Sequence, residues 1–227
     1  IKLIMAYTTI NKSSEHFNTK LYSGTGSSQN ITGVGHQPDL TWIKSRSTTH
    51  EHKLIDAIRG VTKALASDNT TAEFTDVQGL TAFGSDGFSI GTDSYYNTNG
   101  HNYASWNWKA NGSGSANTDG TINSIATSSN ATSGFSIVKY TGNGSTNQTI
   151  GHGLGTVPDF VIVKQTNTTR NWPTYSRAMG NGVTFLDITD AFASGYTNYF
   201  YPAGMTTTTF GISDNGNINE SGGTYIA

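Results

Sequence analysis

The chain has 227 residues and a formal net charge of −2, and only 12% of its residues are charged. A typical soluble domain has about 25%. Without a Lys/Arg cluster there is no basic surface to neutralise phosphates, which argues against a nucleic-acid partner. The sequence has no run of 18 apolar residues and no basic amphipathic helix, so no membrane insertion is expected.

The missing charged residues are replaced by short polar ones. Gly, Ser, Thr and Asn favour turns and solvated strand faces, and they disfavour helix interiors. With 11 Tyr, 10 Phe and 4 Trp the chain has enough aromatic residues to form a core, unlike a disordered chain. The absence of cysteine excludes disulfides and thiolate metal sites. Composition therefore predicts a folded all-β protein.

One long stretch of the sequence occurs twice. Residues 22–44 match residues 140–164 at an offset of 118 to 120 positions, and the match continues downstream. A period of this length is the size of a domain rather than of a solenoid repeat. The sequence therefore predicts two tandem copies of one module. The matched pairs include Tyr22 with Tyr140, Gly24 with Gly142, Gly26 with Gly144, Pro38 with Pro158, Lys44 with Lys164, Asn97 with Asn219 and Tyr103 with Tyr225.

The strand predictions follow the chain in order. A strand that starts at Phe17 leads into a turn at Gly24 and Gly26, where a positive φ is expected. A buried strand at 41–44 follows Pro38. The remaining predictions are two short strands around a turn at 52–65 and again at 172–185, two strands at 80–91, and an alternating strand at 102–108 whose Trp106 and Trp108 share one face.

These elements give four segments. Residues 1–20 form an N-terminal arm that docks on the first module or on a neighbouring subunit, and residues 21–110 form the first module. Residues 111–120 form a linker rich in Gly, Ser and Asn. Residues 121–227 form the second module, which opens with 121–126 and 135–140. Its closing strand is expected to be cut short, because the first copy continues into Trp106 and Trp108.

Four tryptophans are the candidate binding residues. The faces of Trp42, Trp106, Trp108 and Trp172 could stack on sugar rings, while the Thr and Asn side chains around them supply hydrogen bonds. The alternative is core packing, the commoner fate of large aromatic side chains.

No other motif predicts chemistry. The glycine-rich loop at 151–155 leads through Pro158 into a strand rather than a helix, so it is a turn and not a phosphate loop. His50 and His52 lack a third metal ligand. The scattered Asp residues have no calcium-loop spacing and are interpreted as turn formers. The spacing of the carboxylates suggests no catalytic pair. We therefore expect no cofactor, no metal and no enzymatic activity.

Six motifs are specific in combination, although none is catalytic. They are MAYTTINKSSEHFNTKLYSG at 5–24, GVGHQPDLTWIKSR at 33–46, LTAFGSDGFSIGT at 80–92, ASWNWKANGSGSANTDGTI at 104–122, SGFSIVKYTGNGS at 133–145 and IGHGLGTVPDFVIVK at 150–164. Together they resemble a family of tailed-phage structural proteins that are common in marine phages and often labelled tail fibre or appendage proteins. The sequence departs from that family at His36 and Gln37, where an aromatic residue commonly precedes Pro38.

The resemblance implies a virion component built from jelly-roll or lectin-like antiparallel β-sandwich modules, and it carries over no catalytic residue. The expected function is a non-enzymatic tail-fibre or appendage subunit that contacts host-surface glycan. Its expected partners are further copies of itself, as a trimer, and other virion proteins. It would be assembled in the host cytoplasm and act outside the cell. The alternatives are a capsid decoration or cement protein and, less favoured, a glycan depolymerase.

Overall fold

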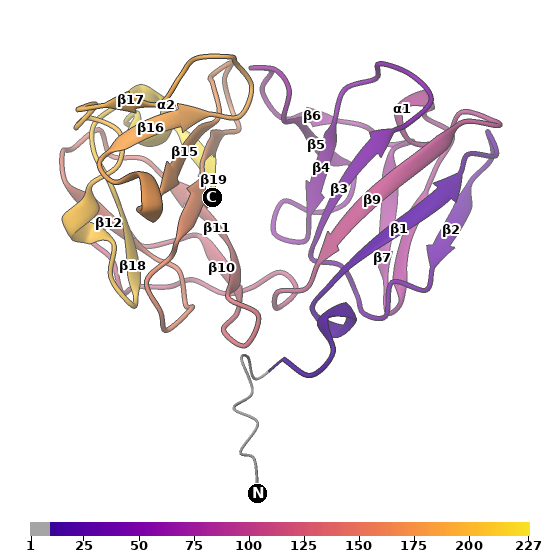
Figure 1. The fold of residues 1–227 in the computed structure, drawn as a ribbon, viewed down its shortest axis with the longest axis horizontal. Helices are drawn as coiled ribbons and strands as arrows, with labels where there is room; N and C mark the ends of the chain where they lie inside the picture. The colour runs from indigo at the N-terminus through magenta and orange to yellow at the C-terminus, as the bar shows by residue number, and fades with distance from the viewer. Residues whose placement is uncertain (1–9) are drawn as a thin grey trace, which may run out of the picture.

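The computed structural model describes residues 10–227, which form an all-β, sandwich-like structure of two units (Figure 1). The fold class predicted from composition is confirmed. Helical structure in these residues is limited to two α-helices and three 3-10 turns, and none is long and apolar enough to cross a membrane. They are α1 (Ser94–Asn97), α2 (Gly216–Asn219), η1 (Ser13–Glu15), η2 (Arg177–Met179) and η3 (Pro202–Gly204).

The first unit packs a six-stranded antiparallel sheet on a three-stranded one. Their shared core includes Ile43 and Tyr103 from the larger sheet and Phe88 from the smaller sheet. The larger sheet has the order β1 (Phe17–Ser23), β9 (Asn102–Trp108), β3 (Leu40–Ser45), β4 (Lys53–Asp56), β5 (Lys63–Ala66), β6 (Phe74–Thr75). The smaller has the order β2 (Gln29–Thr32), β8 (Gly87–Ile90), β7 (Leu80–Gly84).

The second unit divides its strands among three smaller sheets. One has the order β10 (Ala126–Asn130), β11 (Phe135–Thr141), β19 (Thr224–Ile226), β14 (Lys164–Gln165). Another has the order β13 (Phe160–Ile162), β15 (Pro173–Ser176), β16 (Gly182–Phe185), β17 (Ala193–Ser194). The third pairs β12 (Gln148–Gly151) with β18 (Thr209–Ile212).

Most of the predicted strands are present. The paired strands predicted at 52–65, 172–185 and 80–91 are β4 with β5, β15 with β16, and β7 with β8. In β9 the alternation holds: Tyr103, Ser105 and Asn107 are buried against the core, and Trp106 and Trp108 lie on the opposite face. At the opening of the second module no strand forms before Ala126, although Ile122 makes an isolated parallel bridge to Ile150.

Matched positions make matching contacts in the two units. Tyr22 stacks on Tyr103 at 5.1 Å between ring centroids, and Tyr140 stacks on Tyr225 at 5.1 Å. In each unit the second tyrosine accepts a backbone N–H from the residue after the short helix. That donor is Thr98 in the first unit, at 2.9 Å, and its counterpart Glu220 in the second, at 2.7 Å. The repeated residues therefore form the same local arrangement in both units.

The repeated turn uses its two glycines differently. At the second, Gly26 has a φ of 71° and Gly144 has a φ of 71°, as predicted. At the first, the predicted positive φ is wrong, since Gly24 does not have one, and the need for glycine comes instead from close approach: a Cβ on Gly24 would lie 2.2 Å from the carbonyl oxygen of Thr98. The equivalent atom on Gly142 would lie 2.5 Å from the carbonyl oxygen of Glu220.

The linker packs on the second unit, and the described end of the N-terminal arm packs on the first unit. In the linker, Ser115 pairs with Thr127 through backbone hydrogen bonds of 3.2 and 2.7 Å. Of the predicted arm, residues 1–9 lie outside the described part of the chain, and residues 17–20 belong to β1. The carbonyl oxygen of Ser14 lies 3.1 Å from Nδ1 of His36, so the end of the arm packs on the first unit.

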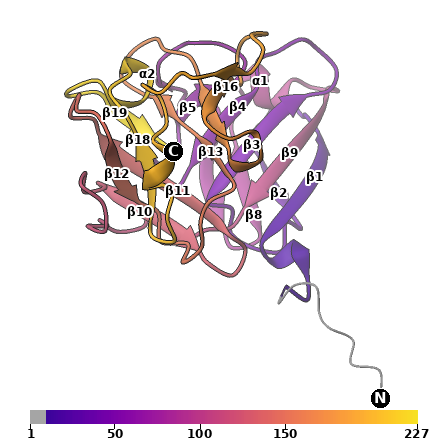
Figure 2. The same ribbon diagram turned by 60° about the vertical axis from the view of Figure 1, so that its left-hand side comes forward.

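A third apolar cluster joins the two units. The first unit contributes Leu54 and Leu65, and the second contributes Ile137, Trp172 and Ile226. Trp108 of the first unit also stacks on Phe135 of the second, with 5.9 Å between ring centroids. The face of β9 that carries the tryptophans is thus turned toward the neighbouring unit. Figure 2 shows the strands of the second unit beside that face.

Candidate functional site

Three of the four candidate tryptophans converge in one hollow. Trp42 on β3 stands directly opposite Trp106 on β9, and their rings meet edge to face at 6.3 Å. Together with Trp108 and His52 they line an open hollow of about 250 Å³, which we call the tryptophan hollow. Two neighbouring strands form it because cross-strand partners in a sheet place their side chains on the same face.

His52 fixes the orientation of Trp42. The indole Nε1–H of Trp42 donates to Nδ1 of His52 at 2.8 Å, and the two rings meet edge to face at 5.7 Å. A nitrogen that accepts carries no proton, so the neutral imidazole holds its proton on Nε2. Burial lowers the pKa of His52, which favours this neutral form. His52 is therefore a neutral, hydrogen-bonded member of the hollow.

The tryptophans of the hollow are half-buried. Trp108 has neighbours from both sides, because the ring of Phe17 lies 4.9 Å from it and the ring of Phe135 lies 5.9 Å from it. Sugar stacking and packing thus compete most directly at Trp108. Trp42 meets Trp106 and His52 within the hollow, and it also packs against the cluster that joins the two units.

Trp172 does not belong to the hollow, and its prediction as a sugar platform is wrong. Its side chain is only 3% exposed and lies in the cluster that joins the two units. Its Nε1–H points at two carbonyl oxygens of the first unit, those of Ala66 and Asn69, each 3.0 Å away. This contact occupies both the apolar ring and the indole N–H of Trp172. Trp172 is an interface residue.

Lys164 lies beside Trp172 and is fully buried. Its Nζ donates to the carbonyl oxygen of Thr70 at 2.9 Å and also to that of Arg170, and it lies 5.7 Å from the centre of the Trp172 ring. Burial lowers the pKa of Lys164 to about 8. A charge held in this way connects the loop at 69–70 of the first unit to the second unit.

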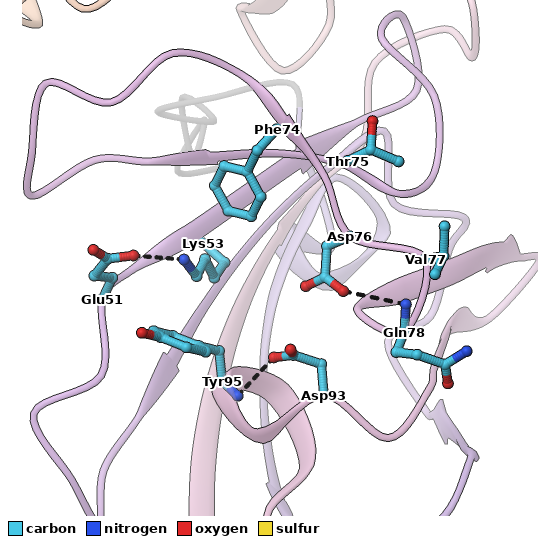
Figure 3. Close-up of a pocket in the computed structure, with 9 residues that line it drawn as sticks. All are labelled: Glu51, Lys53, Phe74, Thr75, Asp76, Val77, Gln78, Asp93 and Tyr95. Atoms are coloured by element: carbon cyan, nitrogen blue, oxygen red, sulfur yellow. Dashed lines mark hydrogen bonds and ion pairs between the residues drawn. The ribbon is translucent and has the colours of Figure 1, made fainter.

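A second pocket, which no sequence pattern indicated, lies in the first unit (Figure 3). Its volume is about 500 Å³. The ammonium of Lys53 lies between two rings, 4.6 Å from the centre of Phe74 and 4.2 Å from that of Tyr95, and it is paired with Glu51 at 2.6 Å. The lining residues are Glu51, Lys53, Phe74, Thr75, Asp76, Val77, Gln78, Asp93 and Tyr95. We call this the carboxylate pocket.

Two further carboxylates stand on the other side of this pocket, as Figure 3 shows. Burial raises the pKa of Asp76, and the negative charge of Asp93 raises it further. Each carboxylate accepts a hydrogen bond from a backbone N–H. Asp76 accepts from Gln78 at 3.1 Å, and Asp93 caps α1 by accepting from Tyr95 at 2.8 Å. Within the described residues neither Asp forms an ion pair, so the pocket carries excess negative charge.

The two histidines considered as a metal pair have separate partners. His50 stacks on Tyr95 at 4.5 Å, whereas His52 belongs to the tryptophan hollow. Across residues 10–227 there is no group of three or more His, Cys, Asp or Glu side chains arranged to hold a metal ion. The loop at 151–155 is a turn, in which the N–H of Leu154 donates to Nδ1 of His152 at 3.0 Å.

A family model described as a domain of unknown function, DUF7483, matches residues 12–227. The chain belongs to this family. No curated protein and no solved structure matches the chain in the corresponding comparisons. The DUF7483 match covers both units and the segment that joins them.

Sequence reasoning on this DUF7483 chain missed His52 as a member of the tryptophan hollow and missed the carboxylate pocket. His52 could have been found from its place just before β4, two positions from Leu54, the residue opposite Trp42, because residues two apart in a strand share a face. Asp76 and Asp93 are 17 positions apart in the sequence. They meet only because the chain passes through β7 and β8 and returns at α1. No spacing rule anticipates that return.

Proposed function

We propose that this chain is a non-enzymatic structural protein of a tailed-phage virion, a tail-fibre or appendage subunit, and that the tryptophan hollow contacts glycan on the host surface. One observation carries the glycan part of the proposal. Trp42 and Trp106, singled out from sequence as sugar platforms, meet in one open hollow with a third tryptophan and a neutral histidine. The virion part is supported by the resemblance of the motifs to tailed-phage proteins.

The chemistry of the hollow suits a neutral sugar. A sugar ring presents C–H groups on one face, which pack on an aromatic ring, and hydroxyls around its rim. The lining is aromatic, and the neutral imidazole of His52 keeps Nε2–H as a hydrogen-bond donor. No ionised side chain lines the hollow. Contacts of this kind are weak individually, and a virion gains affinity by presenting many copies at once.

The test is a titration of the chain with a panel of bacterial surface oligosaccharides, followed by saturation-transfer NMR and tryptophan fluorescence. Trp106→Ala should weaken binding by about 5- to 150-fold, since loss of one stacking face is worth roughly 1–3 kcal/mol. The matched control is Phe160→Ala, which removes an exposed ring (56% exposed) outside the hollow and should leave binding unchanged. If no saccharide perturbs the fluorescence, or if the two variants behave alike, the glycan proposal is wrong.

A capsid decoration or cement protein is the alternative within the virion. It is favoured by the packing of Trp108 between Phe17 and Phe135, which commits part of the aromatic surface to structure. Cryo-electron microscopy of the particle separates the two locations. A projecting three-fold or six-fold appendage with the hollow near its tip supports host contact. A flat position on the shell, bridging capsomers, supports cement.

A glycan depolymerase is the second candidate, and one observation favours it. The carboxylate pocket brings Asp76, with its raised pKa, together with Asp93 and Glu51. Glycoside hydrolysis uses one protonated and one ionised carboxyl group, and unequal pKa values mark such pairs. Release of reducing ends from host polysaccharide, lost in Asp76→Asn but kept in Trp106→Ala, would establish this activity. Absence of release at all pH values between about 4 and 8 supports the non-enzymatic assignment.

A further inference from the structure

The outermost strand of the larger sheet, β1, has no neighbour on one side among the described residues. The sheet begins with β1, which pairs only with β9. In Figure 2, β1 forms the right-hand margin of the molecule, away from the second unit. An open strand edge exposes unpaired N–H and C=O groups and invites another strand.

The second unit fills the same position with its own chain. There β11, the counterpart of β1, pairs with β19 on one side and with β10 on the other. The next position outward is also occupied, because Ser115 pairs with Thr127 of β10. Of the two equivalent edges, the described structure closes one and leaves the other open.

The direction of the backbone groups along β1 follows from its contacts with β9. The carbonyl oxygen of Asn18 accepts from Nδ2 of Asn107 at 3.1 Å, and that of His16 accepts from the N–H of Lys109 at 2.8 Å. The even-numbered residues therefore face β9. Because the direction alternates along a strand, the N–H and C=O groups of Phe17, Thr19 and Leu21 point to the open edge.

The side chains of these three residues are also exposed. Phe17 is 37% exposed, Leu21 is 60% exposed and Thr19 is exposed. The side chain of Lys20, the one charge within β1, is directed to the other face, because its Nζ lies beside Gly33. The open edge thus lacks an outward lysine, one of the devices that normally prevent strand addition.

We propose that the open edge of β1 binds the β1 edge of a second copy of this chain, in antiparallel register about Thr19. This register places Thr19 opposite Thr19 of the partner subunit and Phe17 opposite Leu21 of the partner subunit. Lys20 then faces Asn18 of the partner subunit, so no like charges oppose each other. Residues whose backbone groups point outward form the hydrogen-bonded pairs, each exchanging both N–H···O bonds.

The self-matching pattern is what selects a second copy as the occupant. An antiparallel pairing of identical strands needs paired positions that are symmetric about the centre of the pairing. Among the exposed residues of β1 that point to the open edge, Phe17 and Leu21 lie two positions on either side of Thr19. The two-fold contact is isologous, as in most homodimers. It is independent of any glycan or virion role.

Cysteine cross-linking tests the proposal in a background that has no cysteine. The Cα atoms of a hydrogen-bonded antiparallel pair lie about 5.5 Å apart, within the range that a disulfide spans. Thr19→Cys should therefore give a disulfide-linked dimer on mild oxidation. Phe17→Cys and Leu21→Cys should each form no disulfide-linked dimer alone and should form it when mixed, because only the mixture sets the two thiols opposite each other.

The matched control is Thr207→Cys, which places a thiol on an exposed loop far along the chain from β1. Sedimentation velocity on the unmodified chain should show a concentration-dependent dimer, and Leu21→Lys should weaken it at least about tenfold by removing an apolar contact. The proposal fails if the chain sediments as a monomer at all concentrations and Thr19→Cys links no faster than Thr207→Cys. If Thr19→Cys links but the mixture does not, the register is wrong.

Discussion

The Nε1–H of Trp42 donates to Nδ1 of His52, 2.8 Å away, so one tryptophan of the hollow is oriented by a titratable group. Protonation of His52 would turn the acceptor into a donor and break this bond. The geometry of the hollow is therefore coupled to pH below neutrality.

We expect the chain to lose stability as the pH falls below about 6.5. The pKa of His52 is lower in the folded chain than its ordinary value of 6.5, so the unfolded chain takes up the proton first. The stabilisation is present above about pH 6.5 and is lost as the pH falls toward the folded value. Urea unfolding at pH 7.5 and 5.0 measures the effect. His52→Gln should reduce the difference, and an unchanged difference would show that His36 and His152, shifted in the same direction, account for it.

Lys164 should produce the opposite trend at high pH. Its pKa is about 8 in the folded chain and near 10.5 when unfolded, so between these values the unfolded chain binds more protons. Stability should rise from about pH 8 to pH 10, by on the order of 1–3 kcal/mol. Lys164→Met should abolish the rise. It should also cost about 1–3 kcal/mol at pH 7, because the carbonyl oxygens of Thr70 and Arg170 lose their donor.

Above about pH 10 we expect stability to fall again. Burial raises the pKa of Tyr140 and raises that of Tyr225 to about 12, so the unfolded chain releases these protons first. Together with Lys164 this predicts a maximum of the unfolding free energy between about pH 9 and 10. Tyr225→Phe should reduce the alkaline loss. A curve that falls steadily from pH 7 upward would contradict the prediction.

The first glycine of the repeated turn should not tolerate a side chain. A Cβ at Gly24 would meet the carbonyl oxygen of Thr98 at 2.2 Å, so Gly24→Ala forces the backbone apart and should cost about 1–3 kcal/mol. The control is Gly84→Ala, whose Cβ would meet its nearest neighbour at 3.6 Å, an ordinary contact. Thermal unfolding of both variants makes the comparison. Equal melting temperatures would mean that the turn relaxes freely.

Local pattern predicted many of the strands, because strands such as β1 and β3 alternate between more buried and less buried residues, whereas β4 is a run of buried residues. In β9 it separates Tyr103 from Trp106 and Trp108 correctly. It also predicted that Trp106 and Trp108 share a face. The all-β fold followed from the lack of helix formers, and the two-strand reading of 52–65 followed from Gly60, which has a φ of 94°.

The contacts between the two units could not be predicted from the local sequence pattern. Trp172 and His52 occupy equivalent positions in the repeat. In the first unit this position lines the tryptophan hollow, and in the second unit it packs in the cluster that joins the two units. The carboxylate pocket was missed for a related reason, since Asp76 and Asp93 come from separate turns. Pairings of this kind depend on how elements assemble, which no local spacing records.

The loop at 66–70 gives the two units unequal roles in biosynthesis. Three donors at this junction come from the second unit, namely the side chains of Trp172 and Lys164 and the N–H of Arg170, and they donate to carbonyl oxygens of the first unit; the N–H of Glu73 of the first unit donates to the carbonyl oxygen of Thr166. Bare carbonyls on a finished first unit are readily hydrated, whereas a buried ammonium and indole N–H are not easily left alone. Because a ribosome releases the first unit earlier, the acceptors are waiting when the donors emerge, and the second unit completes its fold on a surface already made.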